Sequence, residues 1–177
     1  GASGMMASPT EMAAAYATLA NGGTYNEAHM VRKIVYKNED KTIKAKVQTH
    51  QPLSPQAAYM TSDLLYRAIF GKDSGWNLMS RLGFGAYPVY GKTGTSDWAD
   101  DAWKYGGPMK DEWMINYTSE YTIATWSGFD SGIEGKPTYI SEEILNANIP
   151  GWINKYMLDS IATGNEHMIS SPGGISS

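Results

Sequence analysis

The chain has 177 residues, of which 42% are hydrophobic and 18% are charged, and this composition supports one packed domain and argues against a disordered chain. Its formal net charge of −4 disfavours nucleic acid as a partner, because phosphate binding requires a basic surface. The absence of cysteine excludes disulfides and thiolate chemistry, and no uncharged apolar run is long enough to form a membrane span.

The first predicted helix begins at Ser8, where a serine, a proline and a glutamate form the pattern of a capping box. Apolar residues then recur at helical spacing until the Asn-Gly-Gly sequence of residues 21–23 ends the helix. A hairpin is predicted next, with strands at residues 30–36 and 42–47 and a polar turn at residues 38–40.

A second helix begins at Ser54 and Pro55 with the same cap chemistry. Its apolar spacing predicts that the buried face consists of Ala57, Met60, Leu64, Leu65, Ala68 and Ile69. Residues 71–85 are rich in Gly, Ser and Asn, which is typical of a loop.

The second half of the chain is predicted to contain three strands and a final helix. The strands occupy residues 87–95, 112–117 and 121–129, and an acidic loop at residues 96–111 joins the first two. The final helix occupies residues 150–162, with Trp152, Ile153, Tyr156, Met157 and Ile161 pointing inward. The tail at residues 170–177 is expected to be flexible. The order of elements predicts an α/β mixture built on an antiparallel sheet.

Residues 91–95, Gly-Lys-Thr-Gly-Thr, form the strongest local motif. A phosphate-binding P-loop would need a glycine where Ala86 stands, a flexible segment where Pro88 stands, and a helix after the motif. These mismatches disfavour a P-loop. The alternative is the Lys-Thr-Gly strand of serine acyl-transferases that act on penicillin-like or D-alanyl substrates.

The residue types of this motif suit that chemistry. On a strand, Thr93 and Thr95 point to one face, where two hydroxyls can hold a substrate carboxylate. Lys92 adds a positive charge, and Gly94 lets a substrate lie against the backbone. On an edge strand, the amide of Thr95 can form half of an oxyanion hole. A Lys-Thr-Gly triplet by itself is only moderately specific, because it also arises by chance at strand ends.

The sequence around the motif is more specific. Residues 8–23, Ser-Pro-Thr-Glu-Met-Ala-Ala-Ala-Tyr-Ala-Thr-Leu-Ala-Asn-Gly-Gly, resemble the segment that precedes the Lys-Thr-Gly strand in class A penicillin-binding proteins. Residues 111–113, Asp-Glu-Trp, and residues 121–130 resemble the next two strands of that family. The resemblance covers residues 1–162, and its details are most similar to the 1b type of Gram-positive cocci.

The resemblance implies the penicillin-binding transpeptidase fold, which serine β-lactamases share. It implies a D,D-transpeptidase that crosslinks peptidoglycan stem peptides through a serine acyl-enzyme and is acylated by β-lactams. Lys92 and Thr95 would be catalytic, and Thr93, Gly94 and Thr95 would bind substrate, with no metal and no cofactor. The protein would act at the extracellular face of the bacterial membrane, and the class A likeness suggests a further glycosyltransferase domain.

Two family motifs are missing from the chain. No serine is followed by lysine three residues later, so the nucleophile motif Ser-x-x-Lys is absent, and Ser-x-Asn is absent as well. Tyr36, Lys37 and Asn38 imitate a Tyr-x-Asn variant but are interpreted as a turn. Ser74 and Asn77 depart from the glycine–threonine–glycine run that is usual after the second helix. We therefore expect residues 1–177 to be the C-terminal portion of a transpeptidase domain.

This expectation has consequences for partners. The N-terminal portion, as a cleaved fragment or a separate chain, would supply the serine and cover the apolar surface of the half-sheet. The isolated chain would then be inactive. The rival hypothesis is a non-catalytic peptidoglycan- or glycan-binding module, suggested by 12 Tyr and 6 Trp and by the missing nucleophile. His29, His50 and His167 lack the spacing of metal ligands.

Overall fold

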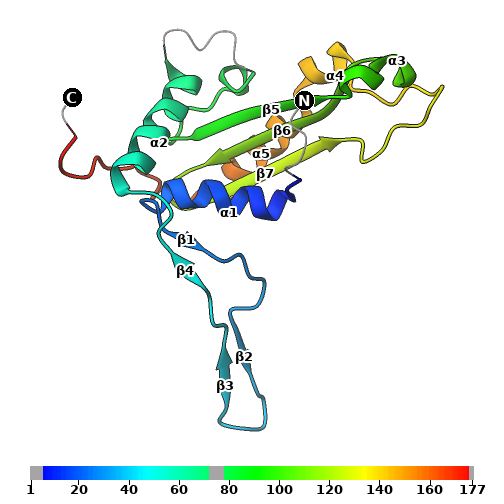
Figure 1. The fold of residues 1–177 in the computed structure, drawn as a ribbon. Coiled ribbons are helices and arrows are strands. Elements are labelled where there is room, and N and C mark those ends of the chain that lie inside the picture. The colour runs from blue at the N-terminus through cyan, green and yellow to red at the C-terminus, as the bar shows by residue number, and fades with distance from the viewer. Residues whose placement is uncertain (1–5, 72–77, 176–177) are drawn as a thin grey trace.

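The computed structural model describes residues 6–71 and 78–175. Figure 1 shows a body of helices around a three-stranded sheet, with a long arm that projects away from it. The elements in chain order are α1 (Pro9–Ala20), β1 (Tyr25–Asn26), β2 (Lys33–Val35), β3 (Thr42–Lys44), β4 (Thr49–His50), α2 (Pro55–Phe70), η2 (Ser80–Leu82), β5 (Tyr90–Asp97), η3 (Ala99–Asp101), α3 (Ala102–Tyr105), β6 (Met109–Tyr117), β7 (Thr122–Gly128), α4 (Glu142–Ala147) and α5 (Ile149–Ile161).

The sheet has the order β5-β6-β7 and is antiparallel throughout. Helix α1 lies on one face and α5 on the other, as Figure 1 shows. The register explains this arrangement, because alternate residues of β6 face opposite sides. The Tyr117 ring lies beside Tyr16 of α1, whereas the Asn116 side chain bonds to Asn154 of α5. The predicted α/β class with an antiparallel sheet is confirmed.

Two apolar cores lie on these two faces. On the α1 face, Leu19 and Ala58 pack with the stacked rings of Tyr90 and Tyr117. The core on the α5 face consists of Ile69, Met79, Val89, Met114, Ile123 and Leu158. Helix α2 contacts both α1 and β5, and its Ser62 hydroxyl accepts a 2.9 Å hydrogen bond from Tyr117. The sheet is therefore held from both sides near the start of β5.

The predicted helix starts are confirmed at both caps. The Ser8 Oγ accepts from the Glu11 amide at 3.3 Å, and the Ser8 amide donates to the Glu11 carboxylate at 2.7 Å. The Ser54 Oγ accepts from the Ala57 amide at 3.1 Å. Cap bonds join residues three positions apart, so the local sequence determines them.

The predicted buried face of α2 is wrong in part. Ala58, Ser62 and Ile69 are buried, whereas Met60 is 56% exposed and Leu64 is 67% exposed. A small alanine and a hydroxyl occupy the inner face because the large rings of β5 and β6 fill the space there. Ile69 is in the core, and Leu65 and Ala68 pack against core residues, so the prediction holds for the residues of the C-terminal half apart from Leu64.

The predicted inward face of α5 is also wrong. Pro150, Gly151, Asn154 and Leu158 are buried, while Trp152, Ile153, Tyr156, Met157 and Ile161 are each at least 39% exposed. The face of α5 that contains Asn154 lies against the sheet, because the Asn154 amide donates hydrogen bonds to Met114 and Asn116 of β6. A pattern that counts only apolar residues misses such a face.

Other boundaries shift by a few residues. The hairpin strands β2 and β3 are shorter than predicted, and a second pair, β1 with β4, forms the base of the arm. Strand β5 begins at Tyr90 and continues to Asp97, and the loop after it contains α3 and the start of β6. Residues 37–38 form the predicted turn. Ser74 and Asn77 lie outside the described residues.

Within the described part of the chain, no helix combines the length and the apolar character needed to cross a membrane.

Candidate functional site

The Lys-Thr-Gly-Thr motif lies in the middle of β5, at an edge of the sheet. Among the described residues, strand β5 pairs with β6 alone, so every second amide of β5 points away from β6. Lys92 and Thr95 are exposed, and Thr93 and Gly94 are half-buried. The motif is therefore open to a ligand along this edge.

The two threonines share a face, as the sequence predicts. Thr93 lies opposite Met114 and Thr95 lies opposite Glu112 on β6, and paired residues of antiparallel strands face the same side. Lys92 lies opposite Ile115, on the other face, and its Nζ donates to the Thr93 carbonyl oxygen at 2.7 Å. The edge thus has a cation on one face and two hydroxyls on the other.

The two glycines of the motif lie where a side chain would contact different neighbours. A Cβ at Gly94 would come within 3.3 Å of the Trp113 Cβ, a tight contact. A Cβ at Gly91 would collide with the Asn116 amide, the Met79 sulfur at 2.8 Å and the Ile115 carbonyl oxygen at 2.9 Å. Gly91 is therefore required by the core, a role that the sequence analysis missed.

The Asp-Glu-Trp segment of β6 holds the C-terminal end of β5 through the Asp111 side chain. The Asp111 carboxylate accepts hydrogen bonds from the Ser96 hydroxyl of β5 and, at 2.9 Å, from the Trp126 indole of β7. Trp113 and Trp126 face each other across β6 and β7 with ring centres 6.4 Å apart. One aspartate therefore links all three strands just beyond Thr95.

Glu112 is a buried carboxyl that the sequence analysis did not identify. It lies on the central strand of the sheet, opposite Thr95 of β5 and Ser127 of β7, and the residue is 2% exposed. Neither carboxyl oxygen has a hydrogen-bond partner among the described residues. Burial raises the pKa of Glu112 to about 7, because the charged form loses its hydration. A glutamate between an aspartate and a tryptophan on a strand gives no sequence signal for this burial.

A polar cluster on the α5 face holds the middle of β6. The fully buried Asn154 amide donates to the Met114 carbonyl and to the Asn116 side chain, both at 3.0 Å, and accepts from the Thr125 hydroxyl at 2.7 Å. The cluster ties α5 to β6 and β7. It therefore supports the strand against which the motif packs.

The other candidates lie apart from β5. His29 bonds to its own loop, His50 packs on Tyr25, and His167 lies beside Ser119. No group of metal-ligating side chains is found in residues 6–71 and 78–175.

Several side chains of the acidic loop form hydrogen bonds or ion pairs with nearby residues. The Asp97 carboxylate accepts from the Ala99 amide, and Asp101 pairs with Lys104 at 2.8 Å. The Trp98 indole donates to the Thr138 carbonyl at 2.7 Å. Trp103 remains 75% exposed.

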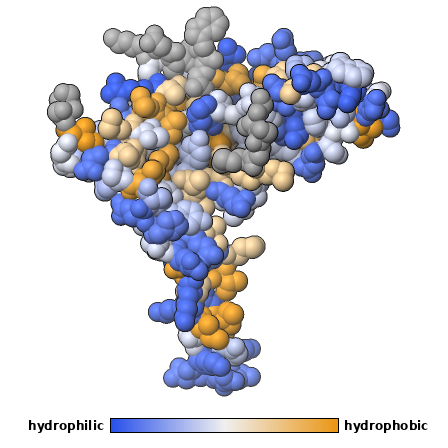
Figure 2. Space-filling view, in the orientation of Figure 1, coloured by the Kyte–Doolittle hydropathy of each residue, from blue (hydrophilic) through white to orange (hydrophobic). Residues whose placement is uncertain are grey.

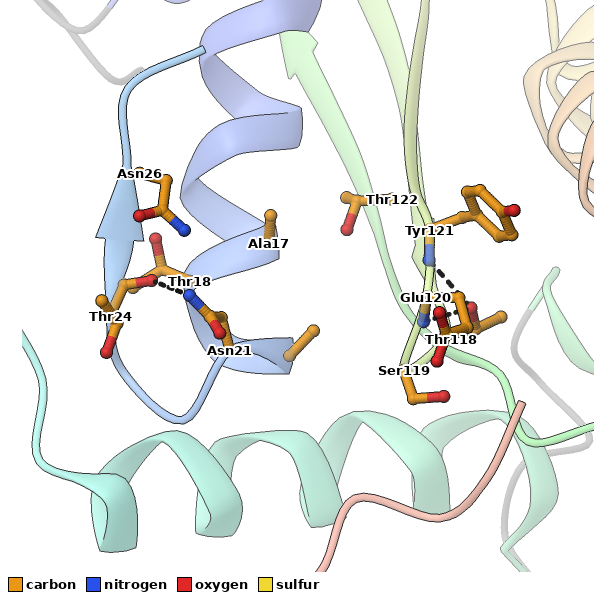
Figure 3. Close-up of a pocket in the computed structure, with 11 residues that line it drawn as sticks. Ala17, Thr18, Asn21, Thr24, Asn26, Thr118, Ser119, Glu120, Tyr121 and Thr122 are labelled. Carbon is orange, nitrogen blue, oxygen red and sulfur yellow. Dashed lines mark hydrogen bonds between the residues drawn. The ribbon is translucent and has the colours of Figure 1, made fainter. Parts of the chain in front are cut away.

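A separate hollow of about 220 Å³ lies between the end of α1, β1 and the β6–β7 turn (Figure 3). Two of its polar side chains make local hydrogen bonds: the Thr118 hydroxyl accepts from the Glu120 and Tyr121 amides, and the Asn21 amide donates to the Thr24 carbonyl. The hollow is at the opposite end of β6 from Glu112 and Thr95. It is not part of the motif site.

Comparison with known proteins identifies the family. Residues 1–133 match the family model of the penicillin-binding protein transpeptidase domain. The chain is 32% identical over 140 residues to penicillin-binding protein 1A/1B of Bacillus subtilis, covering 77% of this chain and 15% of that protein. It is 34% identical over 167 residues to penicillin-binding protein 1A of Clostridium acetobutylicum, covering 94% of this chain and 18% of that protein. The chain thus spans less than a fifth of these relatives.

Solved structures show the same fold. Penicillin-binding protein A of Mycobacterium tuberculosis, solved as a penicillin G acyl-enzyme complex, matches with a TM-score of 0.57 and 18% identity over 85% of this chain and 32% of that one. Penicillin-binding protein 3 of the same organism, complexed with aztreonam, matches with a TM-score of 0.57 and 18% identity over 96% of this chain and 39% of that one. The resemblance to the 1b type of cocci stays a prediction. The chain belongs to the transpeptidase-domain family of penicillin-binding proteins, and its relatives identify it as a class A transpeptidase fragment.

Proposed function

We propose that this chain supplies one wall of the active site of a serine D,D-transpeptidase that crosslinks peptidoglycan. The observation that carries the proposal is the exposure of Lys92 and Thr95 on a sheet edge that no other strand of the described residues covers. We place the reactive serine on polypeptide outside residues 1–177, because the chain contains no Ser-x-x-Lys sequence.

The proposed reaction proceeds in two acyl-transfer steps. The serine oxygen attacks the carbonyl carbon of the D-Ala–D-Ala bond and gives up its proton. The carbon–nitrogen bond then breaks, and the departing amine of the terminal D-alanine takes a proton. In the second step, the amine of a neighbouring stem peptide attacks the ester, and the serine oxygen leaves and regains a proton. A β-lactam enters by the first step and stays bound as an ester.

The strand residues have separate roles in this scheme. The Thr93 and Thr95 hydroxyls bind the terminal carboxylate of the substrate, and Lys92 supplies positive potential to the cleft. The Thr95 amide donates to the oxyanion of the tetrahedral intermediate, an effect worth about 3–4 kcal/mol for a single donor. Gly94 keeps the strand free of a side chain where the substrate lies.

Apolar surface on the outer helices supports the placement of further polypeptide against this chain. Met60 and Leu64 on α2 are more than half exposed, and so is Tyr156 on α5. Exposed apolar side chains grouped on a helix mark a surface that another element covers. We assign that role to the N-terminal portion of the same domain, with the domain at the outer face of the cell membrane.

Labelling by fluorescent penicillin tests this function in the complete protein. We expect Lys92→Ala and Thr95→Val each to lower the acylation rate at least tenfold, because a hydrogen bond to a charged group contributes about 1.5–3 kcal/mol. Lys136→Ala and Thr42→Val change the same residue types at exposed positions away from the motif and should leave the rate unchanged.

Two outcomes would contradict the proposal. Acylation at the normal rate in both motif variants would show that Lys92 and Thr95 are not part of the active site. Saturable glycan binding with no penicillin labelling of the complete protein would favour the rival, a non-catalytic binding module.

A further inference from the structure

The arm between α1 and α2 is a surface that the transpeptidase reaction does not use. Strands β2 and β3 extend from the base formed by β1 and β4, and Figure 1 shows them well away from the body. All residues of β2 and β3 are exposed. A lone two-stranded hairpin in water is only marginally stable, so such an arm gains stability when another surface covers it.

The distal arm, defined as residues 30–47, carries exposed apolar side chains on both faces. Ile34 lies opposite Ile43 on one face and the two are 50% and 45% exposed, while Val35 on the other face is 61% exposed. Met30 and Val31 at its start are 100% and 57% exposed. Figure 2 shows apolar surface along one side of the arm, above a hydrophilic tip.

The distal arm is also basic, in contrast to the rest of the chain. It contains six basic and two acidic residues, a net charge of +4, whereas the whole chain carries −4, so the remaining residues carry −8. None of its charged groups forms an ion pair within the described residues. The basic groups are therefore available to an acidic partner.

The positive charge is concentrated at one place. Lys33 lies directly opposite Lys44 on the same face of the ribbon, and a like-charged pair in this position destabilises a hairpin. Together with Arg32 they line a hollow of about 440 Å³. A carboxylate seated there would remove the repulsion, and apolar side chains beside it would bury Val35.

We propose that an acidic protein partner covers both faces of the distal arm, with carboxylates of the partner in the hollow of Arg32, Lys33 and Lys44 on one face and apolar side chains of the partner over Ile34 and Ile43 on the opposite face. The chemistry of the tip favours a protein over a lipid bilayer. The end of the arm carries Lys37, Glu39, Asp40 and Lys41, so insertion into an anionic membrane would bury two carboxylates along with two ammonium groups.

Photocrosslinking in native cells tests this proposal. A photoreactive phenylalanine analogue replaces Ile34 in the full-length protein, and a second version carries the analogue at Trp103, an exposed residue on α3. We expect a discrete protein adduct from position 34 and no such adduct from position 103. The partner peptide found by mass spectrometry should contain Asp or Glu.

Charge variants in the crosslinking background decide whether the basic hollow makes the contact. We expect Lys33→Glu and Lys44→Glu each to lower the yield of the adduct at least tenfold, and Lys33→Arg to keep it. Lys136→Glu makes the same charge change at an exposed site on the body and should leave the yield unchanged. Thermal unfolding of the purified variants shows whether the fold is kept.

Each remaining result would overturn the proposal. The first is that position 34 gives no protein adduct. The second is that the adduct forms at the same yield in both Lys33→Glu and Lys44→Glu. The third is that the crosslinked partner peptide contains no Asp or Glu. Purified protein is also mixed with phosphatidylglycerol vesicles. Sedimentation that Lys33→Glu abolishes, together with lipid adducts only, would assign the arm to a membrane instead.

Discussion

Replacement of Asn154 by leucine tests the packing that supports the motif strand. Leucine keeps the size of the side chain but removes its two donated bonds, to the Met114 carbonyl and the Asn116 side chain, and the bond accepted from Thr125. Each hydrogen bond contributes about 1 kcal/mol net, and a buried polar group left without a partner costs about 1–3 kcal/mol. We therefore expect a loss of about 3–5 kcal/mol of unfolding free energy.

Urea unfolding of the full-length protein measures this loss. With a slope of about 2 kcal/mol per molar, the midpoint of the transition that contains this domain should fall by about 1.5–2.5 M. Asn146→Leu is the matched control, because Asn146 lies on α4 and is exposed, and its midpoint should stay within about 0.3 M of the parent. If both variants unfold at the same midpoint, the Asn154 cluster does not hold α5 on the sheet.

Three further predictions concern single positions. In the folded protein the pKa of Glu112 is about 7, compared with an ordinary value of 4.5. The free energy of unfolding therefore falls as the pH rises from 4.5 to 7, and it stays low at higher pH. Glu112→Gln should remove this loss and be more stable at pH 8 by about 1–2 kcal/mol, less than the full linkage energy because the buried glutamine amide also lacks hydrogen-bond partners; equal pH profiles of unfolding would contradict it. Gly91→Ala should cost about 1–3 kcal/mol in urea unfolding, because its Cβ meets the Met79 sulfur, whereas Gly85→Ala has open space and serves as the control. Ser8→Ala should lower the thermal unfolding free energy by about 1 kcal/mol through loss of the α1 cap, and an unchanged melting curve would show that the cap is dispensable.

The sequence predicts those parts of the fold that are set by neighbouring residues. The caps at Ser8 and Ser54 act over three positions, and both helices begin where predicted. The alternation that places Thr93 and Thr95 on one face is likewise a property of the strand itself. Family resemblance adds the fold, which the family model and the solved structures confirm.

Packing between distant segments explains what the sequence does not predict. The inner faces of α2 and α5 include Ser62 and Asn154, whose partners lie on β6 and β7, so a count of apolar residues selects the wrong side of α5 and only part of the right side of α2. Burial of Glu112 depends on the strands on both sides of it. The role of Gly91 depends on Asn116, 25 positions away in the chain.

A crystal structure of the complete protein after reaction with penicillin G would show whether residues 92–95 form a wall of the transpeptidase active site. We expect the penicillin carboxylate to lie within hydrogen-bond distance of the Thr93 and Thr95 hydroxyls, with the acyl carbonyl oxygen accepting a hydrogen bond from the Thr95 amide. An acyl group bound to a serine elsewhere, with no contact to residues 92–95, would contradict it.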